Sequence, residues 1–402
     1  MATPTDPPPT PVGARRRRLP TSVARFMGTE AAGGALLLAA ALVALVWANS
    51  SVGGSYRSLW HTEIAFDSDL QHWVNDGLMV VFFFVVGLEI KRELVVGKLR
   101  DPRTAAMPVI AALGGMAVPA LLYLLVTAGS GGSRGWGIPM ATDIAFAVGL
   151  VTVLGRRVPA SLKLFLLTLA VVDDIGAIVV IGVFYSAGLE PRFLAAAAAV
   201  VVAIVLLKRS GVVTLAPYVA LGVALWLATY ASGVHATIAG VVLGLLTPAR
   251  GLRGAAVSPA ERITHVLHPW SSFVIVPVFA LANAGVVIRA DSFDAPGATA
   301  VSAGVVVGLV VGKTVGIAGA AWLAARTGLG RLPDDTTWPM MFAIAAVAGV
   351  GFTVSLFIAE LAFDVGPLQD AAKLGVLAGS TVAALVGGTA LRRACRRRAV
   401  PA

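Results

Sequence analysis

Residues 169–185 read LAVVDDIGAIVVIGVFY, an apolar run interrupted by the adjacent carboxylates Asp173 and Asp174. Such a run predicts a membrane-spanning helix, because about 20 apolar residues in a helix cross roughly 30 Å of hydrocarbon. A single aspartate at the centre of a membrane helix costs roughly 2.5 to 3.5 kcal/mol. Two adjacent aspartates at this place therefore require a function or a compensating partner.

The whole chain shares this apolar character. Of its 402 residues, 57% are hydrophobic and only 13% are charged, and the mean hydropathy is +0.86. These values lie outside the range of soluble domains. Long runs of Leu, Ala, Val and Gly without alternation also argue against a membrane β-barrel. The sequence therefore predicts an all-α polytopic membrane protein.

Apolar runs long enough to be helices recur along the chain, and most approach the length needed to span a bilayer. They cover residues 28–48, 72–90, 104–127, 138–155, 160–186, 190–207, 213–230, 234–248, 263–289, 299–325, 339–363 and 373–391. We therefore expect twelve transmembrane helices in a single unit over residues 28–391.

The basic residues give the expected orientation, because Lys and Arg gather in cytoplasmic loops. With a cytoplasmic N-terminus, 25 of the 31 Lys and Arg residues fall on the cytoplasmic side, five fall outside and one, Lys313, lies within a span. The five outside are Arg57, Arg134, Arg192, Arg289 and Lys373. Both termini are predicted to be cytoplasmic. The net charge of +10 then follows from topology, so it gives no reason to expect a nucleic-acid partner.

The two ends of the chain differ in composition from the expected spans. Residues 1–27 are rich in Pro and Arg and are expected to form a disordered cytoplasmic tail, while residues 392–402 form a basic cytoplasmic tail. A signal peptide is the alternative for the N-terminus, but the following apolar run is long enough to be an uncleaved span. The single cysteine, Cys395, excludes an intramolecular disulfide and argues against a thiol-ligated metal site.

Few ionisable residues lie inside the expected spans, and such residues usually mark an ion pathway. We identify Asp76, Glu89, Asp143, Asp173, Asp174, His235 and Lys313, with Glu360 near an outer end. Adjacent helical residues point about 100° apart, so the two neighbouring aspartates should face different partners. One can face an aqueous cavity and bind a cation, while the other turns to a counter-ion, for which Lys313 is available.

Low dielectric favours the protonated form of a carboxyl group, and Na⁺ prefers oxygen ligands as the harder divalent cations do. A proton and a cation would therefore compete at one of these carboxylates. If the loaded site can face either side of the membrane, this competition becomes exchange. The alternative is a buried Asp–Lys pair that only fixes helix packing.

Two stretches are typical of interrupted helices. In GIPMATDIAFAVG (137–149) Pro139 precedes a short apolar half, and in AVAGVGFTVSLFIAE (346–360) Gly349 and Gly351 divide a span. Interrupted backbone at membrane depth is tolerated where it lines a cavity or is packed within protein. Asp143 could then offset positive helix N-termini and Lys313 negative C-termini. Ordinary kinking by Gly and Pro is the alternative.

Several polar segments closely resemble the NhaA-type sodium/proton antiporters, in order from about residue 30 to residue 390. They are NDGLMVVFFFVVGLEIKREL (75–94), IPMATDIAFAVG (138–149), LAVVDDIGAI (169–178), SGVHATIAG (232–240), HVLHPW (265–270), FALANAGV (279–286), GKTVGI (312–317) and GVGFTVSLFIA (349–359).

The resemblance implies an electrogenic, pH-regulated exchanger of Na⁺ or Li⁺ for H⁺ in the bacterial inner membrane, without a cofactor and with a role in sodium and pH homeostasis. It implies that Asp174 is the main cation and proton carrier, that Asp173 lies beside it and pairs in some states with Lys313, and that Thr142 and Asp143 belong to an unwound crossing.

The resemblance also implies a fold with inverted-topology repeats, and this family is itself an example of such repeats. Spans 3 to 5 would be related to spans 10 to 12, and two discontinuous helices would cross near the middle of the membrane. Core helices are expected at about 104–186 and 299–391, and interface helices at about 28–98 and 190–289.

Residues that match the family's pH-sensing region are Glu89, Glu93, His265 and His268. The alternative is that they anchor helix ends at the membrane interface. His235 is a further pH-sensing candidate, and for it a packing role is favoured over that of an essential proton carrier. This chain has Thr264 where the family is expected to have an acidic residue, so the family's pH response is not carried over in detail.

The expected partners are membrane lipid and a second copy of the chain, and no protein partner is inferred. The loop 49–71 is short for the hairpin through which the family is thought to dimerise.

Two other functions are alternatives to cation/proton exchange. One is an intramembrane aspartyl protease using Asp143 and Asp174, although the glycine-flanked aspartate of that class is absent. The other is a proton-coupled symporter of an organic solute, which would need a roomier site.

Overall fold

The computed structural model describes residues 21–65, 68–186, 188–212, 214–250, 257–288 and 290–398. Its α-helices are α1 (Thr21–Ala48), α2 (Gly53–Trp60), α3 (Leu70–His72), α4 (Met79–Val95), α5 (Pro102–Val126), α6 (Ile144–Val153), α7 (Ala160–Phe184), α8 (Pro191–Arg209), α9 (Leu215–Ala231), α10 (Thr237–Leu246), α11 (Pro259–Trp270), α12 (Val276–Asn283), α13 (Ala298–Val307), α14 (Lys313–Arg326), α15 (Trp338–Val347), α16 (Phe352–Ala362) and α17 (Pro367–Arg398).

Shorter elements join or extend these helices. Within the residues described, three stretches are π-helical: η1 (Trp73–Leu78), η6 (Ser271–Ile275) and η8 (Gly308–Gly312). The 3₁₀ stretches are η2 (Lys98–Arg100), η3 (Ser133–Met140), η4 (Gly155–Arg157) and η7 (Ala290–Phe293), and the strands are β1 (Glu63–Ala65) and β2 (Ser68–Asp69). The protein is thus a helical, multi-pass membrane protein, as the sequence predicts.

Each of the twelve expected spans overlaps helix in the described residues. Eight helices there are long and apolar enough to cross a membrane, and a ninth span results if the bent pair α15 and α16 counts as one. The other three expected spans lie in the stretch from α3 to α4 and in the short helices α9 and α10. The expected tail boundaries differ: α1 already begins at Thr21 and α17 continues to Arg398, while residues 1–20 lie outside the described residues.

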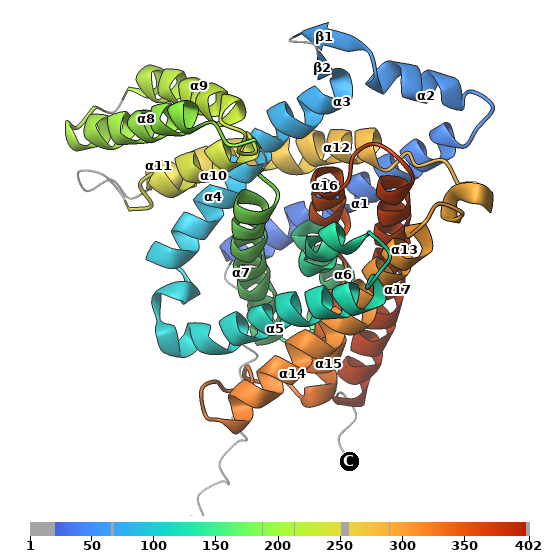
Figure 1. Ribbon diagram of the computed structural model, residues 1–402. Coiled ribbons are helices and arrows are strands. Elements are labelled where there is room, and N and C mark those ends of the chain that lie inside the picture. Colours follow the sequence, from blue (N-terminus) through green and yellow to red (C-terminus); the bar gives the residue numbers. More distant parts are fainter. Residues whose placement is uncertain are drawn as a thin grey trace, which may run out of the picture.

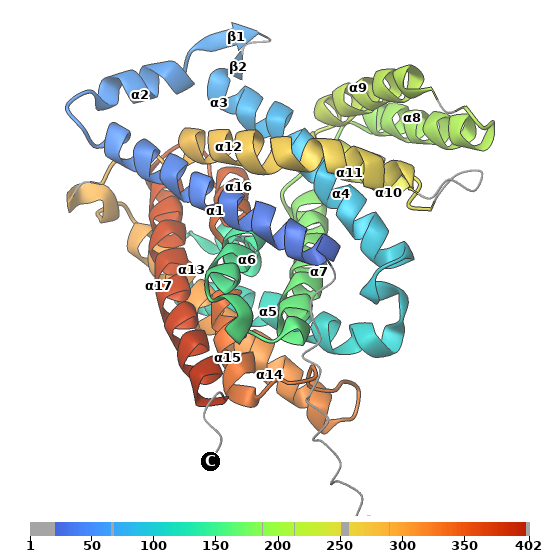
Figure 2. The same ribbon diagram turned by 180° about the vertical axis from the view of Figure 1, so that it is seen from behind.

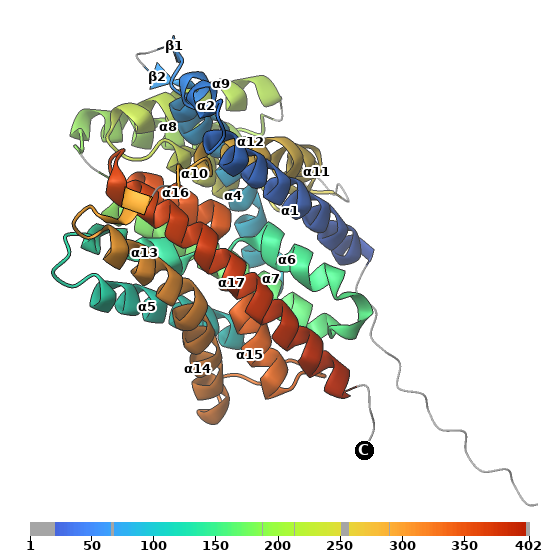
Figure 3. The same cartoon turned by 90° about the vertical axis from the view of Figure 1, so that its right-hand side faces the viewer.

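The helices form two groups that cross each other (Figure 1). In one, α5 packs along α14 and α17 packs along both α13 and α15. In the other, α4 packs along α10 and α1 along α12. Figure 2 shows α1 lying across α6, and the contact between these two helices joins the groups. Figure 3 shows α17 running along the side of the first group, with the pair α8 and α9 standing apart from it.

Small residues bring the paired helices close together. At the α4–α10 contact, a Cβ on Gly87 would lie 2.7 Å from the opposite helix, and a Cβ on Gly244 would lie 2.6 Å from it. Gly114 of α5 and Gly316 of α14 face each other's backbone in the same way. Close backbone approach through small residues is how membrane helices gain packing energy, since lipid provides no hydrophobic driving force between them.

Both stretches expected to interrupt helices do so in the structure. The chain passes from η3 through extended residues at Ala141–Asp143 into α6, and α15 and α16 are separated at Ala348–Gly351 with a bend of 47°. The breaks touch, because the Asp143 N–H donates to the carbonyl of Val350 at 2.7 Å. A Cβ on Gly351 would lie 2.9 Å from the Ala141 carbonyl oxygen, so this close approach requires glycine.

The loop between α1 and α3 contains α2 and a small antiparallel hairpin, in which Glu63 is paired with Asp69 and Ala65 with Ser68. Tyr56 of α2 donates a hydrogen bond from its hydroxyl to the carbonyl of Leu281 at 2.8 Å, which ties the loop to α12. Helix α2 is therefore held against α12 of its own chain. Dimerisation through it stays a prediction.

Candidate ion-binding site

Asp143 lies where the two interrupted helices meet. It is the N-cap of α6 and accepts a hydrogen bond from the Phe146 N–H at 3.0 Å. Its other oxygen accepts from the N–H of Thr353 at 3.0 Å and from the Thr353 hydroxyl at 2.6 Å. One carboxylate thus serves the N-termini of α6 and α16, both of which carry partial positive charge.

Asp173 of α7 faces the neighbouring helices. Its Oδ2 accepts hydrogen bonds in an ion pair with Lys313 of α14, and both side chains are fully buried. The Thr142 hydroxyl lies 2.6 Å from the same oxygen and 2.8 Å from the carbonyl oxygen of Ala348, so its single proton can serve one of the two. The other oxygen of Asp173 is buried and accepts no hydrogen bond within the described part of the chain.

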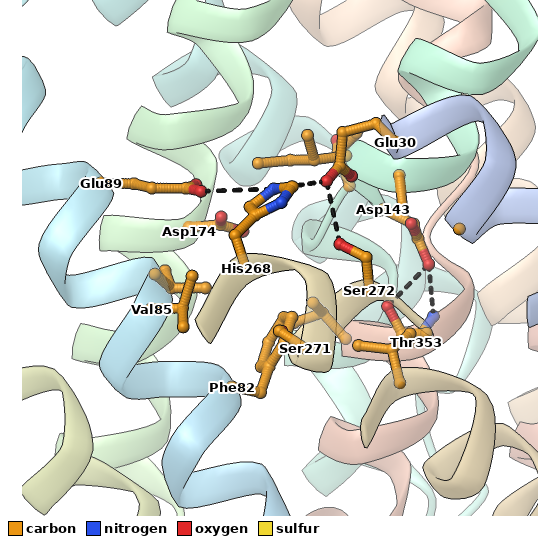
Figure 4. A pocket seen from close by; sticks show the side chains of 17 residues that line it. Glu30, Phe82, Val85, Glu89, Asp143, Asp174, His268, Ser271, Ser272 and Thr353 are labelled. Atoms are coloured by element: carbon orange, nitrogen blue, oxygen red, sulfur yellow. Dashed lines mark hydrogen bonds and ion pairs between the residues drawn. The ribbon is translucent and has the colours of Figure 1, made fainter. Parts of the chain in front are cut away.

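Asp174 points in a different direction, into a cavity of about 60 Å³. The cavity is lined by Glu30, Gly33, Phe82, Val85, Val86, Glu89, Thr142, Asp143, Ile144, Ala145, Asp174, His268, Ser271, Ser272, Val276, Thr353 and Val354. Figure 4 shows the Asp174 carboxylate close to the Glu89 and His268 side chains, with Asp143 on the opposite side of the cavity. No described residue donates a hydrogen bond to Asp174, so its oxygens remain available to a ligand.

A second charged group lies on the cavity wall. His268 Nε2 is 2.7 Å from Glu30 and 3.9 Å from Glu89, and the Ser272 hydroxyl donates to Glu30 at 3.2 Å (Figure 4). Sequence analysis missed Glu30, although it lies within the expected first span at 28–48. It is an intramembrane carboxylate like the others, so the same signal could have identified it. The hydroxyl groups of Thr353 and Ser272 carried no comparable signal.

The remaining candidates for pH sensing are not brought to the cavity. The Nε2–H of His235 donates to the carbonyl of Tyr185 at 2.8 Å, which is a packing contact between the turn before α10 and the end of α7. Glu93 accepts a hydrogen bond from the N–H of Lys98 at 2.8 Å and so closes the turn after α4. His265 is exposed on α11. The structure thus groups only Glu89 and His268 of the five candidates.

The helix-break residues Pro139 and Gly349 pack against the neighbouring element η8. Pro139 lies against η8, where a Cβ on Gly308 would fall 2.5 Å from its ring. Gly349 lies against the carbonyl of Leu309 in the same element. Both breaks are therefore packed within protein, which is the condition for interrupted backbone at membrane depth.

A resident metal centre would require several converging ligands. Within the described ranges, no group of three or more His, Cys, Asp and Glu side chains is arranged to hold a metal ion. The arrangement is instead one carboxylate with free oxygens, one carboxylate held by a lysine, and one that joins two helix ends. It can bind and release a small cation or a proton.

Comparison with known proteins places this arrangement in a family. The family model described as Na⁺/H⁺ antiporter 1 matches residues 24–391. The chain is 47% identical to Na⁺/H⁺ antiporter NhaA 3 of Frankia alni, covering 96% of this chain and 92% of that protein. It is 49% identical to NhaA of Streptomyces avermitilis, with coverage of 92% and 81%, and 47% identical to NhaA of Bordetella parapertussis, with coverage of 93% and 97%. The chain therefore belongs to the Na⁺/H⁺ antiporter 1 family of membrane transporters.

Proposed function

We propose that this protein exchanges Na⁺, and also Li⁺, for H⁺ across the bacterial inner membrane by alternating access, with Asp174 as the carrier. The observation that carries the proposal is the contrast between two adjacent carboxylates. Asp173 is held by Lys313, whereas Asp174 has free oxygens in a cavity of about 60 Å³. Only Asp174 can therefore take up and release a ligand without breaking an existing ion pair.

Competition at Asp174 would couple the two ions. The ionised carboxylate offers oxygen ligands to Na⁺, and a proton that neutralises it removes the charge that attracts the cation. Nearby oxygens of Thr142 and Asp143 line the same cavity and can complete the coordination. Because one site holds either ion, its exposure to alternate sides of the membrane produces exchange.

The touching helix breaks provide a way to move this site. Asp143 and Thr353 join α6 to α16, so the two interrupted helices would move together with α7 and its aspartates. We infer twelve spans arranged as inverted repeats, with each break in a corresponding span of its repeat. Both termini would be cytoplasmic, and a second copy of the chain and membrane lipid are the expected partners.

The small volume of the cavity argues against the alternative function, a proton-coupled symporter of an organic solute. Sites for drug-sized molecules occupy about 300 to 1,000 Å³, whereas this cavity measures about 60 Å³. It has room for a cation with a few water molecules, each of which needs about 10 to 15 Å³ by this kind of measure. The protease alternative fails because the chain belongs to a transporter family.

The group formed by Glu30, His268 and Glu89 is the best candidate for pH regulation. Histidine is the residue type that most often acts as a pH switch, and this imidazole lies between two carboxylates on the wall of the ion cavity. Its protonation would alter the local negative potential that attracts cations to Asp174.

Transport in everted membrane vesicles tests the proposal. After acidification of the vesicle interior, Na⁺ or Li⁺ should cause proton efflux reported by a pH-sensitive dye, and K⁺ should cause little. Asp174→Asn should abolish the response, whereas the control Asp364→Asn, at an exposed position after α16, should retain it. Binding of radioactive Na⁺ to the purified protein should also be lost in Asp174→Asn. Full transport by that variant, or equal responses to all three salts, would contradict the proposal.

A further inference from the structure

A second cavity lies away from the ion site, between η1, the start of α8 and the end of α9. It measures about 500 Å³ and is lined mainly by apolar and aromatic side chains. None of the residues that line it lines the ion cavity. A volume of this size can hold a small organic group rather than a bare ion.

One wall of this cavity is a continuous row of aromatic rings. The ring centroids of Trp73 and Trp226 are 6.2 Å apart, those of Trp226 and Tyr230 are 6.2 Å apart, and those of His72 and Tyr230 are 6.1 Å apart. All four side chains line the cavity. Aromatic faces attract cations, and they attract organic ammonium groups well because these are easily desolvated.

A carboxylate lies beside the aromatic wall. Asp76 lines the cavity, and its Oδ2 is 3.2 Å from His72 Nε2. The indole N–H of Trp226 donates to the backbone carbonyl of Asp76 at 3.0 Å, which fixes the ring next to the carboxylate. Both Trp73 and Asp76 belong to the π-helix η1, and π-helical turns within α-helices often occur at functional sites. The wall therefore combines π faces with a negative charge, the features that recognise an ammonium ion.

A positive charge lies at the rim of the same cavity. The Arg192 guanidinium carbon is 4.7 Å from the centre of the Phe193 ring, and Phe193 lines the cavity. Arg192 is three-quarters exposed and its only carboxylate neighbour in the described residues, Glu190, is 3.6 Å away and half-exposed. Arg192 can therefore bind a phosphate group. The cavity thus offers sites of both signs.

The surroundings favour a lipid over a soluble zwitterion. Only 6% of the apolar window of α8 is buried inside the protein, and Leu194 of α8 and Leu227 of α9 are exposed beside the cavity. These faces offer an apolar surface for acyl chains. Trp and Tyr gather where a membrane protein meets the headgroup region, which is also where a headgroup would lie.

We propose that this cavity binds the headgroup of a zwitterionic phospholipid with a primary ammonium, such as phosphatidylethanolamine. The ammonium lies against Trp226 and Tyr230 beside Asp76, and the phosphate meets Arg192. In the orientation inferred above, the lipid belongs to the outer leaflet. The lipid would hold the pair α8 and α9 against η1, independently of ion binding at Asp174.

Lipid retention by the full-length protein tests this site. Delipidated protein in detergent is titrated with dioleoylphosphatidylethanolamine, dioleoylphosphatidylglycerol or free phosphoethanolamine, and bound molecules are counted by native mass spectrometry. We expect the ethanolamine lipid to be retained about tenfold more tightly than the glycerol lipid. Asp76→Asn should lose most of this preference, whereas Arg192→Gln should weaken the retention of both lipids, because both carry the phosphate that Arg192 binds. Arg192→Gln changes an exposed side chain, so misfolding would not explain its effect.

Trp226→Leu is compared with a matched control. Trp322 of α14 is also a partly exposed tryptophan, and it has Arg326 stacked over its ring at 4.9 Å. Trp322→Leu should retain the preference that Trp226→Leu loses. Equal retention of the two lipids by the wild type, or unchanged retention in Asp76→Asn and Arg192→Gln, would overturn the site. Saturation by free phosphoethanolamine at the same concentration as by the lipid would overturn a lipid as its occupant.

Discussion

Replacement of Lys313 by alanine should destabilise the protein in a way that depends on pH. Lys313 and Asp173 are both fully buried and form an ion pair, so removal of the lysine leaves a carboxylate without a counter-ion. Breaking a buried ion pair in this way costs about 3 to 5 kcal/mol. The Thr142 hydroxyl, at 2.6 Å, can offset only part of this cost.

The pH dependence arises because the Asp173 carboxyl group, without its lysine partner, can be neutralised by a proton instead. Folding of the variant is then accompanied by proton binding. The free energy of unfolding should then fall by about 1.4 kcal/mol for each unit that the pH rises, in the range where the unfolded chain has lost this proton and the folded protein still holds it. Destabilisation should be small near pH 5 and large near pH 8.

The melting temperature of detergent-solubilised protein measures this effect. For a chain of 402 residues, an unfolding entropy of about 2.1 cal/mol/K per residue converts 1 kcal/mol into about 1.2 °C. Lys313→Ala should therefore melt about 4 to 6 °C lower than the wild type at pH 8. Adding Asp173→Ala to the same variant should restore most of the loss, because no buried charge then remains unpaired.

Lys163→Ala is the matched control. Lys163 is also a buried lysine, but its ammonium donates to the backbone carbonyl of Gly155 at 3.1 Å. Its loss leaves the uncharged carbonyl oxygen of Gly155 without a hydrogen-bond donor. The destabilisation should therefore be about 1 to 3 kcal/mol at every pH. If Lys313→Ala loses the same stability at pH 5 and pH 8, or if the double variant is no more stable than the single one, the reasoning about this ion pair is wrong.

Three further predictions concern the crossing and the cavity wall. Gly351→Ala should impair transport and lower the melting temperature, because the added Cβ would lie 2.9 Å from the carbonyl oxygen of Ala141. Both are measured as described above. Normal activity of this variant would show that the two helix breaks need not approach closely. Thr353→Val should cost about 1 to 3 kcal/mol in thermal unfolding, since it removes the 2.6 Å hydrogen bond to Asp143, and an unchanged melting temperature would contradict this. Glu30→Gln should move the pH profile of transport to lower pH, because the neighbouring imidazole then holds its proton less tightly. An unchanged profile would remove Glu30 from pH regulation.

The fold class and the main carboxylates could be predicted from the sequence for a simple physical reason. The thickness of the bilayer sets the length of each apolar run, and the cost of charge in hydrocarbon makes residues such as Asp143, Asp173 and Asp174 conspicuous. The helix breaks at Pro139 and Gly351 were visible for a similar reason, because both residue types disturb helices locally.

Other features depend on contacts between residues far apart in the chain. The helical period shows that two adjacent aspartates diverge, but only the packing of α7 against α14 decides that Asp173 meets Lys313 and that Asp174 faces the cavity. Lys313 was expected either as the counter-ion of an aspartate or as an offset to helix C-termini, and the contact observed is the ion pair with Asp173. The side chain has one ammonium group, and the buried carboxylate binds it more strongly than a carbonyl does.

Glu30 shows most clearly what tertiary structure adds. In the sequence it is a single carboxylate near the start of an apolar run. Ser272, whose hydroxyl donates a hydrogen bond to it, lies 242 positions later in the chain. The sequence alone determined that the chain crosses the membrane repeatedly and carries buried carboxylates, because both follow from the local cost of placing each residue in lipid. Only the tertiary structure decided which carboxylates are paired and which one is free, because pairing depends on how α1, α7, α11 and α14 pack in space.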